Sequence, residues 1–123
     1  MPQEDLYIGL GNLAYAVAKA DGELSKEEEE ALTEILEEQD HGDIALFAFK
    51  IKHHMNSLPE EAYRFALRRL RANEQEFSED QKEQFIYVLD KVAHASKGVN
   101  SKEQRLLERL RKDLKSLQQK KNR

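Results

Sequence analysis

The sequence predicts an all-α fold of about six helices, in which two helix-turn-helix units are related by a pseudo-two-fold axis around a central buried helix. Apolar residues recur at helical spacing along most of the 123 residues, and proline occurs only at positions 2 and 59. No alternation of polar and apolar residues is long enough for a strand. A shift of the chain by 75 positions also places the first predicted helix pair on the last.

The first three helices follow from apolar spacing and from start and stop signals. The first covers about residues 4–20 and ends at Asp21-Gly22. The second begins at Ser25, which forms the S-x-x-E pattern of a capping box with Glu28, and extends to about residue 39, near Gly42. The third, over about 43–55, is apolar on nearly every side, so we expect it to be the central, buried helix.

The last three helices each begin at a cap signal. The fourth begins at Ser57, with Pro59 in its first turn and Glu60 at the capping-box position. The fifth begins at Ser78, with Gln81 three residues on, and the sixth begins at Asn100, with Glu103 at the capping-box spacing. We expect one helical domain over residues 1–117 and a basic, frayed tail over residues 118–123.

The internal repeat needs no gap. The shift of 75 positions aligns apolar residues of the first and fifth helices, the cap Ser25 with Asn100, and Glu28 with Glu103. Any two amphipathic helices share a period, so chance agreement is the alternative. Because the loop, the cap and the capping-box acid match together, the sequence favours duplication. The aligned apolar residues are Leu10, Leu13, Ala14 and Val17 with Phe85, Val88, Leu89 and Val92.

Charge is distributed unevenly along the chain. The net charge is −4, but residues 1–43 hold 13 acidic and 2 basic side chains, whereas residues 100–123 hold 3 acidic and 9 basic ones. We therefore expect a protein partner to bind an acidic face at the second helix, with ordinary solvated helix surface as the alternative. The residues of this predicted face are Asp21, Glu23, Glu27, Glu28 and Glu30, with Glu34 and Glu37 behind them on the second helix.

A weak divalent-cation site is a second hypothesis for the same loop. Asp21 and Glu28 carry hard oxygen ligands that suit calcium or magnesium. Their spacing matches the second half of an EF-hand loop, but Val17 and Lys19 stand where the first ligands belong and cannot coordinate calcium. Helix capping and solubility explain the same residues without a metal, and no other cofactor is expected.

The sequence argues against catalysis. It contains no cysteine, no G-x-S-x-G and no glycine-rich phosphate loop. The pair Gly9 and Gly11 lies within a predicted helix, where it favours close helix packing. The histidines at positions 41, 53, 54 and 94 lack the i, i+4 spacing of a zinc site, and we expect them on the surface or at helix ends.

Binding to nucleic acid is not expected, although the fourth helix is basic at Arg64, Arg68, Arg69 and Arg71, because the first third of the chain is strongly acidic. The basic tail leaves membrane contact open as an alternative. The first ten residues lack the features of a secretory signal, so a cytoplasmic location is expected. The oligomeric state is left open.

The elbow between the first two helices carries a family resemblance. The segment from Ala18 through Asp21-Gly22 to Glu28, with a degenerate second copy near the C-terminus, resembles the TerB-like domain. That family includes bacterial tellurite-resistance proteins and the N-terminal domain of a membrane-anchored DnaJ-type co-chaperone.

The resemblance covers about residues 4–117. It implies an all-helical fold of two similar halves, no known catalytic centre, and a scaffold or sensor role in stress-linked complexes. The family's acidic loop maps onto Asp21 and Glu28. In the second copy Ser96-Lys97 replaces Asp-Gly, so a function that needs both loop acids is not expected.

Overall fold

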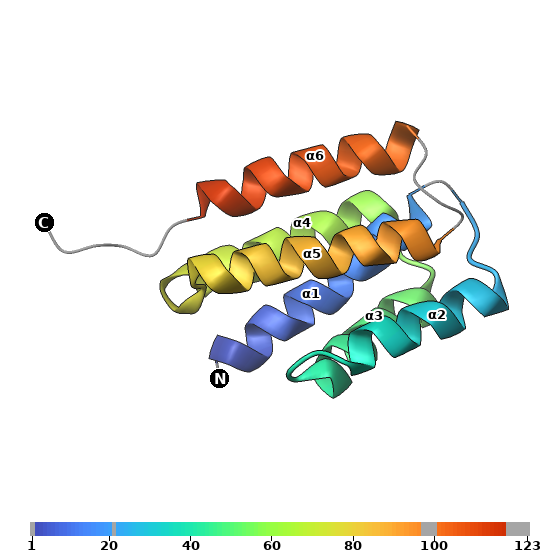
Figure 1. Ribbon diagram of the computed structural model, residues 1–123, viewed down its shortest axis with the longest axis horizontal. Helices are drawn as coiled ribbons and strands as arrows, with labels where there is room; N and C mark the ends of the chain where they lie inside the picture. The colour runs from blue at the N-terminus through green and yellow to red at the C-terminus, as the bar shows by residue number, and fades with distance from the viewer. Residues whose placement is uncertain (1, 21, 97–100, 118–123) are drawn as a thin grey trace, which may run out of the picture.

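The computed structural model describes residues 2–20, 22–96 and 101–117, and over those residues the chain forms six α-helices, one short 3₁₀ helix and no strand (Figure 1). The prediction of an all-α fold is confirmed. The elements in chain order are α1 (Pro2–Lys19), α2 (Lys26–Glu37), α3 (Gly42–Met55), α4 (Pro59–Ala72), η1 (Glu74–Glu76), α5 (Glu79–Ala95) and α6 (Ser101–Ser116).

The central helix is α1. It packs against α3, α4, α5 and α6, while α2 lies against α3 and α5 (Figure 1). Every residue of α1 from position 9 to position 19 is buried. The prediction that the helix at 43–55 is central is wrong, because α3 packs through one side only and leaves Phe47 67% exposed.

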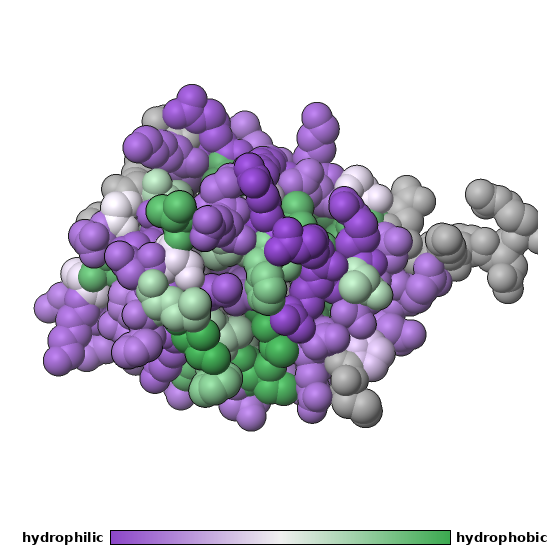
Figure 2. Space-filling model, turned by 180° about the vertical axis from the view of Figure 1, so that it is seen from behind, coloured by the Kyte–Doolittle hydropathy of each residue, from purple (hydrophilic) through white to green (hydrophobic). Residues whose placement is uncertain are grey.

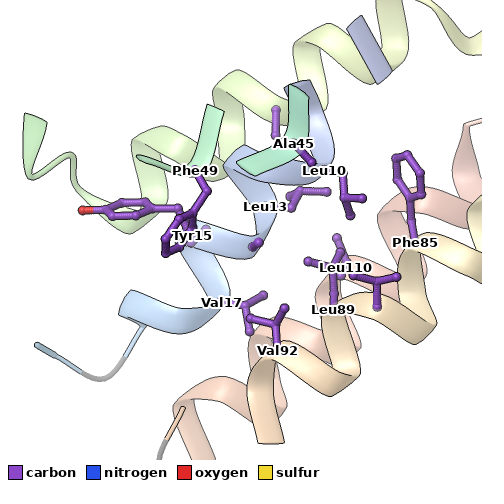
Figure 3. Packing of buried hydrophobic residues seen from close by; sticks show 14 of the residues in the cluster. Leu10, Leu13, Tyr15, Val17, Ala45, Phe49, Phe85, Leu89, Val92 and Leu110 are labelled. Carbon is purple, nitrogen blue, oxygen red and sulfur yellow. The ribbon is translucent and has the colours of Figure 1, made fainter. Parts of the chain in front are cut away.

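The core is formed on both sides of α1 (Figure 3). Val17 lies beside Val92 of α5, and Leu13 and Leu89 belong to the same cluster; all four are fully buried. On the side of α3, the ring of Tyr15 meets Phe49 edge-on at 6.1 Å between centroids. Each buried aliphatic side chain contributes about 1.5–3 kcal/mol of transfer free energy, so the enclosure of α1 supplies most of the cohesion of the bundle.

Close packing of α1 depends on Gly11. A Cβ atom at this position would overlap the carbonyl oxygen of Ala45 and lie 2.9 Å from the Cβ atom of Ala48. At Gly9 the nearest atom would be the Cδ2 atom of Leu70, at 2.9 Å, which belongs to a side chain that can move. The expectation that these glycines permit close helix packing is confirmed, and Gly11 is the more demanding position.

The helix starts follow the predicted caps in two of three described cases. Capping boxes form at Ser25–Glu28 and at Ser78–Gln81. The capping box predicted for Ser57 and Glu60 is wrong: Leu58 occupies the N-cap without a side-chain hydrogen bond, and the Glu60 carboxylate bonds to Arg109 instead. Asn100, the predicted cap of α6, lies outside the described residues, as does the predicted tail at 118–123.

The shift of 75 positions is reflected in the helices. The first residue of α2, Lys26, corresponds to Ser101, the first residue of α6. The aligned apolar residues of α1 and α5 are all fully buried. The two copies differ in surroundings, because α3 and α4 cover the side of α1 that has no counterpart on α5. Among the described helices, none is long and apolar enough to span a membrane.

We predict that Gly11→Ala lowers the free energy of unfolding by about 2 kcal/mol, as overpacking forces α1 away from the backbone of α3. Gly9→Ala should be nearly neutral, because Leu70 can shift and alanine gains about 1 kcal/mol of helix propensity. Urea denaturation of both variants measures the difference. Equal destabilisation, or a larger loss for Gly9→Ala, would contradict this packing.

Candidate functional site

The elbow between α1 and α2 is built from a glycine turn, an apolar anchor and a cap. Gly22 has a φ of +130°, a backbone conformation that side-chain-bearing residues rarely adopt. Leu24 packs against the core. The backbone N–H of Glu28 donates to Oγ of Ser25 at 3.1 Å, and the backbone N–H of Ser25 donates to Oε1 of Glu28 at 2.8 Å. The elbow therefore fixes the direction in which α2 leaves the core.

The structure separates the residues of the predicted acidic site. Asp21 lies outside the described residues. Glu23 is in the elbow and its carboxylate is 3.3 Å from Nζ of Lys19. The Glu28 carboxylate serves the capping box. Glu27 and Glu30 are exposed on the outer side of α2.

Exposed carboxylates continue along α2 through Glu34 and Glu37, which belong to the predicted face, to Glu38. They recur every three or four residues, so they lie along one side of the helix over about 16 Å. We call this set the acidic stripe. Its members are Glu27, Glu30, Glu34, Glu37 and Glu38, all of them exposed.

The C-terminal half of the acidic stripe does not stabilise α2. Glutamates four residues apart repel one another, and Glu37 lies at the C-terminal end, where the helix dipole disfavours negative charge. The last turn of α2 contains no basic residue. Within the described part of the chain, only Glu38 of the stripe forms an ion pair, at 3.9 Å from Nζ of Lys91. The stability of α2 therefore does not account for Glu34 and Glu37.

No group of three or more histidine, aspartate or glutamate side chains placed to hold a metal ion occurs among the described residues. The hypothesis of a calcium or magnesium site at Asp21 and Glu28 stays a prediction, since Asp21 is not described. Val17, where an EF-hand would place its first ligand, is fully buried. The histidines are dispersed: His41 is the N-cap residue that precedes α3, and Nε2 of His53 lies 3.6 Å from Oε1 of Glu29.

The comparisons with known proteins agree with this architecture. The family model described as tellurite resistance protein TerB matches residues 8–120. The chain belongs to the TerB family. Neither the search of curated proteins nor the search of solved structures found a significant match.

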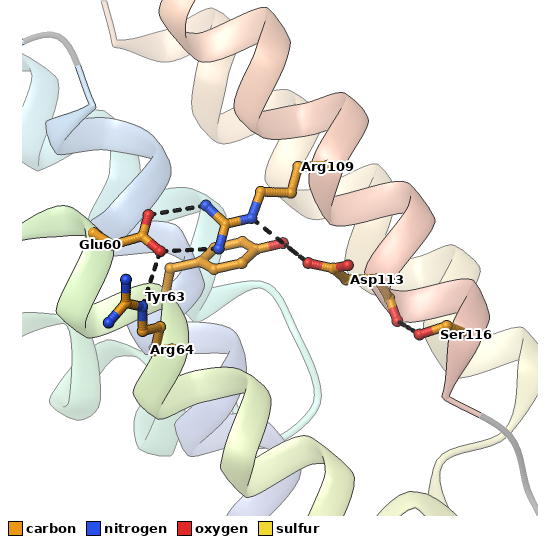
Figure 4. A network of polar contacts seen from close by, with 6 residues as sticks. All are labelled: Glu60, Tyr63, Arg64, Arg109, Asp113 and Ser116. Atoms are coloured by element: carbon orange, nitrogen blue, oxygen red, sulfur yellow. Dashed lines mark hydrogen bonds and ion pairs between the residues drawn. The ribbon is translucent and has the colours of Figure 1, made fainter.

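A second polar cluster in this TerB-family fold was not anticipated from sequence (Figure 4). Arg109 of α6 donates two hydrogen bonds to the Glu60 carboxylate, at 2.8 and 2.9 Å, and its guanidinium lies 4.1 Å from the centroid of the Tyr63 ring. The Tyr63 hydroxyl donates to Oδ2 of Asp113 at 2.6 Å. We call these four residues the α4–α6 clasp. The residues that the clasp joins are about 50 positions apart in the sequence, so no local spacing pattern predicts these contacts.

Contacts within the clasp shift the pKa values of two of its groups, Glu60 and Tyr63. The two hydrogen bonds from Arg109 lower the pKa of Glu60 from 4.5 to about 2. Burial, together with the hydrogen bond to Asp113, raises the pKa of Tyr63. Each of the four groups is engaged with another, so the clasp fixes α6 to α4 in the TerB fold rather than presenting a reactive group.

We predict that Glu60→Gln reduces stability at neutral pH and that its deficit relative to the wild type shrinks on acidification. Glu60 has a lowered pKa in the folded state, so its contribution is present above pH 4.5 and is lost as the pH falls toward 2. Urea denaturation of both proteins from pH 7 to pH 2 measures the deficit. A deficit that stays constant over this range would show that ionised Glu60 does not stabilise the clasp.

Proposed function

We propose that this chain is a non-catalytic interaction domain whose acidic stripe binds a basic segment of a protein partner, within a stress- or tellurite-resistance-related complex. The observation that carries the proposal is the C-terminal half of α2. Glu34 and Glu37 are exposed, repel their neighbours and lie toward the end of the helix that disfavours negative charge. A basic partner would remove that repulsion.

The stripe is supported by a rigid helix. Leu32 and Leu36, on the opposite side of α2, are fully buried, and the capping box at Ser25 fixes the N-terminal end. The carboxylates are thus held at set positions before a partner arrives, which reduces the entropy lost on binding. Clustered charge of one sign also accelerates encounter with an oppositely charged surface, and that effect weakens with salt.

Charge reversal on α2 tests the proposal. The chain and a variant with three stripe residues changed, Glu30→Lys, Glu34→Lys and Glu37→Lys, serve as baits for partners from the native cell extract. We expect the variant to lose the partner that the wild-type chain captures and to remain folded, because all three positions are exposed.

A matched control changes the same total charge at exposed glutamates on other elements. It carries Glu61→Lys, Glu76→Lys and Glu108→Lys. This control should retain the partner, and the wild-type interaction should weaken between 50 and 300 mM salt. Equal loss of the partner in both triple variants would show that net charge, and not the position of the acidic stripe, determines binding. Retention of the partner by the α2 variant would refute the proposal.

A further inference from the structure

The outer side of α3 carries a row of exposed apolar residues. Phe47, Ile51 and Met55 are 67%, 41% and 63% exposed. They are four residues apart, so they form one straight row over about 12 Å of helix. We call this row the apolar stripe. Figure 2 shows apolar surface gathered in the lower half of the face seen from behind, with polar surface around it.

The fold does not use the apolar stripe. The residues of α3 that pack on α1 include Ala45 and Phe49, on the other side of the helix. Single exposed apolar residues are common on soluble proteins, and Tyr87 on α5 is one such case. A row at four-residue spacing is instead the ridge with which one helix packs against another.

Basic side chains border the apolar stripe. Lys50 and His54 are exposed on α3 itself. Toward α4, Nζ of Lys52 lies 4.3 Å from the centroid of the Phe65 ring, and the Arg68 guanidinium lies 5.9 Å from the same ring. In the part of the chain that the structure describes, Lys50, Lys52 and Arg68 form no ion pair with a carboxylate.

Acidic side chains are fewer on this surface. Asp43 is exposed at the start of α3, Glu61 is exposed on α4, and Oε1 of Glu29 on α2 lies 3.6 Å from Nε2 of His53 on α3. The surroundings of the apolar stripe are therefore mainly positive, the opposite of the acidic stripe on α2.

We propose that the apolar stripe, with Lys50, Lys52 and Arg68 beside it, is the docking site for an acidic amphipathic helix of a partner protein. A straight row at i, i+4 and i+8 fits a helix laid along it, whose apolar side covers Phe47, Ile51 and Met55. Glutamates flanking that apolar side would meet the basic residues on both edges. The unbranched side chain of Met55 adapts to different partner side chains.

A second copy of this chain fits the site less well. Two identical faces brought together would place the basic borders of both copies against each other, with Lys50 near the Lys52 and Arg68 side of the partner copy. The acidic stripe is on a different helix, so this proposal does not depend on the proposed function.

A designed peptide tests the docking site. The probe is a fluorescein-labelled helical peptide with leucine at i, i+4 and i+8 and glutamate at the flanking positions, and its binding is followed by fluorescence anisotropy. We expect saturable binding to the wild-type chain and at least a tenfold weaker Kd for Phe47→Gln combined with Met55→Gln. Tyr87→Gln, which removes an equally exposed but isolated aromatic, should leave the Kd unchanged.

Charge variants distinguish docking that depends on charge complementarity from nonspecific hydrophobic binding. Lys50→Glu combined with Arg68→Glu should weaken binding at least fivefold, and a peptide with glutamine in place of glutamate should bind at least fivefold more weakly. The triple variant on α2 should bind the acidic peptide as well as the wild type does, so failure of this proposal is distinguishable from failure of the proposed function.

Four results would overturn the inference. The first is absence of saturable peptide binding to the wild type. The second is equal affinity for the glutamate and glutamine peptides. The third is a molecular mass that doubles with concentration in the wild type but not in the Phe47→Gln and Met55→Gln variant, which would assign the face to a second copy. The fourth is co-sedimentation of the wild type, but not of that variant, with vesicles containing anionic lipid, which would assign the face to a membrane surface.

Discussion

Burial of α1 on all sides is the constraint on which the other helices depend. From position 9 to position 19 its residues are removed from solvent, so helices must cover every side of it. The near-continuous run of small and apolar residues makes this enclosure favourable, and Gly11 allows α3 to approach the helix backbone. The second copy of the repeat, α5 and α6, covers only one side of α1. The connecting helices α3 and α4 cover the opposite side of α1.

Local signals in the sequence were sufficient for the helices and two caps. Ser25 and Ser78 were identified from the S-x-x-E and S-x-x-Q patterns because a capping box is formed within four residues. The same pattern failed at Ser57, where the Glu60 carboxylate is held by Arg109 from 49 residues away. A capping pattern shows which local hydrogen bonds a segment can form. A stronger hydrogen bond to a residue distant in sequence can take the place of the capping bond.

Apolar composition was a poor guide to which helix is central. The helix at 43–55 is apolar on most sides, yet Phe47 and Met55 face outward. In α1 the central position depends on glycine and alanine at the contacts, which lower its apparent hydrophobicity while permitting close approach. Of the residues predicted for an acidic face, Glu27 and Glu30 are exposed and belong to the acidic stripe, whereas the Glu28 carboxylate serves the cap. Glu34 and Glu37, predicted behind this face, also belong to the stripe, and Glu38 continues the same spacing.

The surface is organised by the ring of helices around α1. The α2 helix presents carboxylates that its own stability does not require. The α3 and α4 helices present apolar and basic side chains in adjacent positions. Fixed on one rigid core, two surfaces of opposite character would allow a small TerB-family domain to bring a basic segment and an acidic helix together. That arrangement is consistent with an adaptor, because neither surface has to move for the other to be occupied.

Native-state hydrogen exchange tests the central role of α1 most directly. If α1 is enclosed as described, the backbone amides of residues 10–18 exchange only through global unfolding and are the slowest in the chain. The amides of α3 should exchange faster, through local opening at its exposed side. The account is contradicted if the slowest amides lie in α3 and those of α1 exchange at a lower free energy of opening.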